Sequence, residues 1–116
     1  MTKQWYNWTS ANIAVWNKSK FPNNTAARQR MKLAGEITEF NEAITPEHKL
    51  EELADVYIAS AGLTRFGGNN AKIGSFICSV LESADKKGKL QYAVGQKMLI
   101  NIERQFDENM HHIGKK

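Results

Sequence analysis

The chain has 116 residues, of which 41% are hydrophobic and 24% charged, and its formal net charge is +4. This length predicts one domain around a single core, and the composition is ordinary for a soluble globular protein. No apolar run approaches the roughly 18 residues that a membrane helix requires, which excludes a membrane-spanning helix. The single cysteine, Cys78, excludes an internal disulfide, and its apolar neighbours predict a buried thiol. Residues 1–10 lack the apolar centre of a secretory signal, so we expect a cytoplasmic protein.

The charges are segregated along the sequence. Residues 1–35 carry +6, residues 36–55 carry −6 and residues 56–116 carry +4. Seven of the twelve acidic residues therefore fall within residues 36–55. A basic surround with an acidic centre suits a polyanion and a divalent cation together, whereas nucleic-acid binding needs only the basic part. The charge pattern alone leaves both interpretations open.

Apolar residues recur at helical spacing through most of the chain, which predicts an all-α bundle of four to five helices. Turn residues at 21–24, a proline at 46 and glycines at 67 and 68 separate these helices. The first is expected over about residues 2–18, and the second runs from a cap at residue 24 or 25 to just before residue 46. The others are expected over about residues 46–66, 71–85 and 90–108, and residues 111–116 are expected to fray.

The second expected helix carries one apolar stripe at steps of four, three and four residues, formed by Leu33, Ile37, Phe40 and Ile44. The third, with Thr45 as its cap and Pro46 at its first position, has a core-facing stripe at Leu50, Leu53, Ala54, Tyr57 and Ala61. The other face of the third helix begins with Glu52 and Asp55 and then becomes apolar. We therefore expect these two acids at the mouth of an interior, where charge requires compensation.

Two helix-spaced acid pairs stand out, Glu36 with Glu39 and Glu52 with Asp55. Side chains three residues apart share one helix face, with Cβ atoms roughly 5–6 Å apart. A short turn joins the two helices, which makes them antiparallel neighbours and brings the pairs together. Four carboxylates in that position predict a site for a hard cation, Mg²⁺ or Mn²⁺, rather than for zinc.

Residues 35–43 (GEITEFNEA) and 51–56 (EELADV) resemble the MazG-like nucleotide pyrophosphohydrolases of the all-α NTP pyrophosphatase superfamily. The family signature is E-x-x-E followed by E-x-x-D, and the twelve residues between Glu39 and Glu52 lie at the short end of its spacing. The resemblance covers about residues 21–106. It includes a K-x-x-x-N-x-x-R element, here Lys97, Asn101 and Arg104, which contacts phosphates in many members.

This resemblance implies Mg²⁺-dependent hydrolysis of a non-standard or surplus nucleoside triphosphate to the monophosphate and pyrophosphate. The metal would be held by the catalytic acids Glu36, Glu39, Glu52 and Asp55. A water activated by the metal would attack phosphorus, and the basic element would stabilise phosphate charge. The family also implies a homodimer or homotetramer. Many members carry another acid where this chain has Gly35, so the general base is left open, with Glu42 and Glu51 as candidates that also suit a solvated surface.

Trp5, Trp8 and Trp16 suit a core or a dimer interface, and one of them is a candidate for stacking on the base. The three histidines are expected on the surface. A phosphoribosyl-ATP pyrophosphatase of the same superfamily is an alternative in substrate. A non-catalytic module that binds nucleic acid or protein through the basic segment 18–32 is an alternative in class, although we do not expect nucleic acid or a membrane as the partner.

Overall fold

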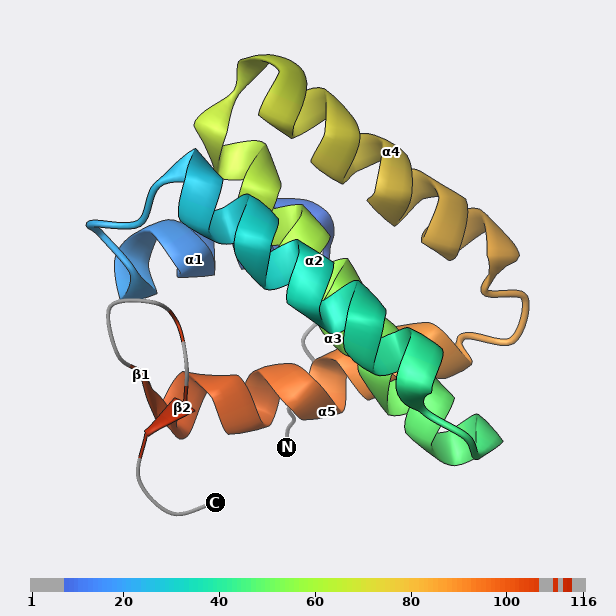
Figure 1. Cartoon of the computed structure of the whole chain (residues 1–116). Helices are drawn as coiled ribbons and strands as arrows, with labels where there is room; N and C mark the ends of the chain where they lie inside the picture. The colour runs from blue at the N-terminus through green and yellow to red at the C-terminus, as the bar shows by residue number, and fades with distance from the viewer. Residues whose placement is uncertain (1–7, 107–109, 111, 114–116) are drawn as a thin grey trace, which may run out of the picture.

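Helix α3 (Pro46–Leu63) lies at the centre of the molecule and contacts every other α-helix (Figure 1). This computed structural model describes residues 8–106, 110 and 112–113. The described residues form five α-helices, which confirms the predicted all-α class. The remaining elements are α1 (Ser10–Lys20), α2 (Ala26–Glu42), η1 (Thr64–Phe66), α4 (Gly68–Ala84), α5 (Lys89–Glu103), β1 (Gln105–Phe106) and β2 (His112–Ile113). In the described part of the chain, none of the helices has the length and hydrophobicity to cross a membrane.

The C-terminal half of α3 is buried on all sides, as its apolar character predicted. One of its faces packs with α1, α4 and α5 around a core of Ile13, Ala54, Tyr57, Ile58, Ala61, Cys78, Leu90, Val94 and Met98. The opposite face packs with α2 in a smaller cluster of Leu33, Val56, Ala59 and Leu63. Because α3 is held between these two cores, the acids on its N-terminal half have a fixed position.

A threonine hydroxyl caps the N-terminus of each of the first three helices. Thr25 and Thr45 cap α2 and α3 by accepting hydrogen bonds from the backbone N–H groups of Arg28 and His48, both at 3.1 Å. Thr9 caps α1 in the same way, so this helix begins at Ser10 and not near residue 2 as expected. Trp8 therefore precedes the helix, and residues 1–7 lie outside the described part of the chain.

The buried face of α2 differs from the predicted stripe. Its buried side chains are Gln29, Leu33 and Glu36, whereas Ile37 is 40% exposed. Ile44 is 87% exposed, because α2 ends at Glu42 and leaves this residue in the connecting turn. The helix thus faces α3 along a line that includes two polar residues. This orientation turns Glu36 toward the interior.

A buried amide network joins α1, α2 and α3. Gln29 Nε2 donates to the carbonyl of Ala59 at 2.9 Å, and its Oε1 accepts from Asn24 at 2.8 Å. Asn17 Oδ1 accepts from the Arg65 guanidinium at 2.8 Å. A Cβ on Gly62 would lie only 2.6 Å from Gln29 Nε2, so a glycine is required where the network crosses α3.

The C-terminal helices also differ from expectation at their ends. α4 begins at Gly68, three residues before its expected start, and Gly67 and Gly68 supply the positive φ of the turn. α5 ends at Glu103 instead of near residue 108, and β1 then pairs with β2 in antiparallel register. Residues 112 and 113 of the segment expected to fray form strand β2, and the rest of that segment lies outside the described residues.

Candidate functional site

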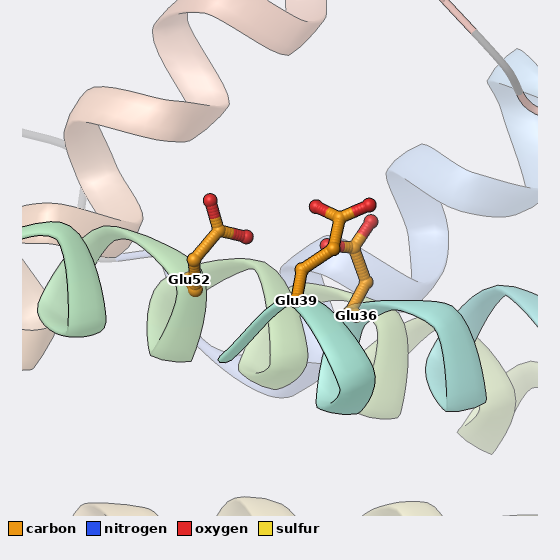
Figure 2. A group of neighbouring side chains, drawn as sticks. All are labelled: Glu36, Glu39 and Glu52. Carbon is orange, nitrogen blue, oxygen red and sulfur yellow. The ribbon is translucent and has the colours of Figure 1, made fainter. Parts of the chain in front are cut away.

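Three of the four predicted acids lie together where α2 and α3 run side by side. Oxygen atoms of Glu36, Glu39 and Glu52 all lie within 4.8 Å of one another. Figure 2 shows the carboxylates of the two α2 residues and of Glu52 on α3 pointing to the same side of the helix pair. The spacing of the two acid motifs and the short turn between the helices account for this convergence.

Two oxygens of this group are buried without a hydrogen-bond partner among the described residues. They are Oε1 of Glu36 and Oε1 of Glu52. Glu36 is only 7% exposed. Burial and the neighbouring Glu39 carboxylate raise the pKa of Glu52, although His48 and Lys97 oppose the rise. A buried carboxylate oxygen without a partner costs free energy, and a cation bound between these side chains would remove that cost.

Asp55, the fourth predicted acid, lies next to these three carboxylates but pairs with a lysine. Its Oδ2 lies 3.3 Å from Lys97 Nζ on α5. Burial raises the pKa of Asp55 to about 6. The Lys97 ammonium lowers this pKa, and the carboxylates of Glu36 and Glu52 raise it further. Asp55 is therefore coupled electrostatically to the three-carboxylate group even though it is not one of its members.

Basic side chains contact two members of the group in ways that sequence reasoning missed. Lys32 Nζ lies 2.9 Å from Glu36 Oε2, and His48 Nε2 lies 3.0 Å from Glu52 Oε2. Both pairs have the i, i+4 spacing that places side chains on one helix face, so the spacing could have identified them. His48 is exposed, as expected of the histidines, while His111 and the side chain of His112 lie outside the described residues.

A cavity of about 90 Å³ adjoins the acids. Glu36 and Asp55 line it on one side, and Lys32 and Arg104 also line it. Its aromatic wall is formed by Trp16, Phe21 and Phe106, whose rings pack edge to face at 5.6 and 5.2 Å between centroids. Carboxylates, cations and aromatic rings thus surround one hollow between α1, α2, α3 and α5.

The three residues of the predicted phosphate element are placed differently from one another. Lys97 pairs with Asp55, whereas Asn101 and Arg104 line the cavity. Asn101 is 9% exposed, and its Nδ2 donates to Met98 Sδ at 3.9 Å. The Arg104 guanidinium makes no ion pair with any described residue. Lys97 and Asn101 lie on α5, whereas Arg104 follows the last helical residue in an extended conformation, so the predicted helix face does not extend to Arg104.

The predicted aromatic residues divide among different places. Trp16 lines the cavity beside the acids, and Trp8 borders other hollows of the surface near α5. Both are partly buried against the main core. Trp5 lies outside the described residues. Of the predicted tryptophans that the structure describes, only Trp16 is in a position to meet a ligand at the acids.

Glu42 and Glu51, the candidates for a general base, are exposed and lie outside the three-carboxylate group. A Cβ on Gly35 would have no described atom within 4 Å, so this position, where the resemblance implied a further acid, is open space. The donor set at the site itself consists of carboxylate oxygens, with a buried, unpartnered oxygen from each of two helices. That set fits a hard cation such as Mg²⁺ or Mn²⁺.

Searches with this sequence and structure match no family model, no curated protein and no solved structure.

Proposed function

We propose that the protein is a MazG-like nucleoside triphosphate pyrophosphohydrolase that depends on Mg²⁺, with Mn²⁺ as a possible substitute. The observation that carries this proposal is the convergence of three carboxylates from α2 and α3 within 4.8 Å, with two buried oxygens that no described residue satisfies. This convergence supports the paired motif, because the same residue types on surface helices would point apart into solvent.

In this proposal Glu36, Glu39 and Glu52 would hold the metal, and Asp55, which pairs with Lys97 beside them, would be the fourth acid of the site. The metal would neutralise phosphate charge and lower the pKa of the attacking water. The protein contributes position: α3 is fixed between two cores, so its acids are held in place before the substrate arrives. We assign no residue as general base, because the position of Gly35 offers no side chain.

In this proposal the cavity beside the acids binds the phosphate groups and the base of the nucleotide. Arg104 and Lys97 would bind phosphate oxygens, and a guanidinium without a described ion-pair partner is available for that contact. Asn101 offers a buried amide at the wall of the same cavity. Trp16 presents an aromatic ring at the same hollow, which suits the base of the nucleotide.

We further propose that the protein is a cytoplasmic homodimer or homotetramer. Ile73, Phe76 and Val80 are 46%, 69% and 48% exposed on α4, which runs along the outside of the molecule (Figure 1). Their steps of three and four residues form an apolar stripe on one helix face. Such a stripe on the outer surface is typical of a helix that packs against another protein chain.

The test is pyrophosphate release from a panel of canonical and modified nucleoside triphosphates, with Mg²⁺ or with EDTA. The wild type should release pyrophosphate from at least one triphosphate only with Mg²⁺, and Glu52→Ala should abolish release. Glu47→Gln, which removes an exposed carboxylate from the same helix, is the matched control and should retain activity. Release that persists in EDTA or in Glu52→Ala would contradict the proposal, as would no release from any triphosphate.

A further inference from the structure

Lys32 connects the three-carboxylate group to the cavity. Its Nζ lies 2.9 Å from Glu36 Oε2, and the same side chain lines the cavity together with Arg104. The Lys32 side chain is 31% exposed, so a solute in the cavity can reach its ammonium. Neither acid motif nor the basic element on α5 includes this residue. Its position, however, is the one at which a metal and a phosphate group would meet.

The stability of α2 alone does not explain the ion pair. A lysine that precedes its glutamate by four residues has the less favourable orientation on a helix. Pairs of this kind contribute little to stability on exposed surfaces. The Glu36 side chain, by contrast, is only 10% exposed and needs a positive charge nearby. Lys32 is therefore best understood as the counter-ion of a buried ligand acid.

A divalent cation at the carboxylates changes the role of Lys32. The cation takes over the charge of Glu36 and repels the ammonium beside it. The Lys32 side chain can then turn to the cavity, where it already forms part of the wall. The pair of Lys97 with Asp55 repeats this arrangement from α5. Each of two lysines thus pairs with one of the four acids, and Lys32 is the one that also lines the cavity.

We propose that Lys32 is a further phosphate-binding residue, which neutralises Glu36 in the metal-free protein and passes to a phosphate oxygen of the nucleotide once a divalent cation occupies the carboxylates. This inference rests on the proposed function and names a residue of the same site. This exchange makes the binding of metal and the binding of polyphosphate cooperative. A bound cation frees Lys32 for the phosphate, and a phosphate bound to Lys32 removes the ammonium that competes with the cation for Glu36. By linkage, the metal must strengthen polyphosphate binding by the factor by which polyphosphate strengthens metal binding.

Lys32→Gln tests this exchange, because the substitution should raise the affinity for Mg²⁺ alone and lower the affinity for a nucleotide analogue. Without the competing ammonium, Mg²⁺ alone should bind about two- to fivefold more tightly. An α,β-methylene triphosphate, which cannot be cleaved at that bond, should bind in Mg²⁺ roughly tenfold more weakly, because one charge-assisted contact is lost. Lys32→Arg keeps a cation at the position and should stay near the wild type in both measurements.

The measurement is isothermal titration calorimetry of the full-length protein, with Mg²⁺ alone and with the analogue in saturating Mg²⁺. Arg30→Gln is the control, since it removes a cation from the same helix that instead binds Asn70 at 2.8 Å. If Lys32→Gln weakens Mg²⁺ binding, or leaves analogue binding as in Arg30→Gln, Lys32 is only a structural counter-ion and the inference fails. If the wild type binds neither Mg²⁺ nor the analogue, the proposed function itself fails.

Discussion

Replacing Asp55 by Asn should stabilise the metal-free protein at pH 8. Burial and two neighbouring carboxylates raise the pKa of Asp55 from 3.8 to about 6, even with Lys97 beside it. The rise corresponds to about 3 kcal/mol of preference for the neutral form in the folded state. Because the folded pKa lies above the unfolded one, this contribution to stability is complete below pH 3.8 and is lost as the pH rises through about 6. An asparagine is neutral at every pH, so the variant retains this contribution to stability at pH 8.

The assay is urea unfolding in EDTA at pH 4 and pH 8, with Glu51→Gln as a control for removing an exposed acid from the same helix. Asp55→Asn should exceed the wild type by up to about 3 kcal/mol at pH 8, and the difference should be small at pH 4. Adding Mg²⁺ should stabilise the wild type more than the variant, because binding to the folded state adds stability. An Asp55→Asn protein that is less stable than the wild type at pH 8 in EDTA would refute the electrostatic reasoning.

Four further predictions concern the packing and the site. Gly74→Ala should destabilise the protein by about 1–3 kcal/mol in urea unfolding, because the new Cβ would lie 2.3 Å from the carbonyl oxygen of Ser60. Gly35→Ala, with open space at its Cβ, should stabilise the same protein by about 0.5–1 kcal/mol, and equal effects of the two changes would contradict the helix packing. Burial raises the pKa of the Cys78 thiol to about 12, so the folded protein should react with a thiol reagent at pH 8 only at the rate of its unfolding. Glu39→Gln should weaken Mg²⁺ binding at least tenfold by calorimetry, and unchanged affinity would remove this residue from the metal site.

The helix order and the centrality of α3 were predictable because they depend on local patterns. Threonine caps at positions 25 and 45, the proline at 46 and the unbroken apolar character of the segment 56–63 are all visible in the sequence. The burial of Cys78 follows from the same reasoning and is confirmed. The acid pairs converge because two motifs on antiparallel neighbours have little freedom to do otherwise.

The orientation of α2 was not predictable from hydrophobicity. The predicted stripe was right at Leu33, which is buried, but wrong at Ile37, because the buried line of α2 runs through Gln29 and Glu36. Gln29 donates to the Ala59 carbonyl of α3, and Glu36 pairs with Lys32 of its own helix. A polar side chain is buried at little cost when a partner satisfies it, and sequence spacing does not show a partner on another helix such as the Ala59 carbonyl. The network of Asn17 and Arg65 was missed for the same reason.

The predicted start of α1 and the predicted end of α5 lie several residues beyond the observed limits of these helices, for a different reason. Tryptophans before residue 9 fit a helical period, but Thr9 offers the backbone a cap, and this local hydrogen bond decides where α1 begins. At the other end, β1 pairs with β2, which lies beyond the predicted end of the helix. Periodicity identified the helices, whereas caps and tertiary pairing set their limits.

The most direct test of the account is the binding of Mn²⁺ to the metal-free protein, followed by electron paramagnetic resonance as the signal of free Mn²⁺ decreases. The account predicts that the wild type binds Mn²⁺, that Mg²⁺ displaces it, and that Glu36→Gln combined with Glu39→Gln removes the binding. A wild type that leaves the Mn²⁺ signal unchanged, or a double variant that binds as the wild type does, would show that the three carboxylates are not a metal site.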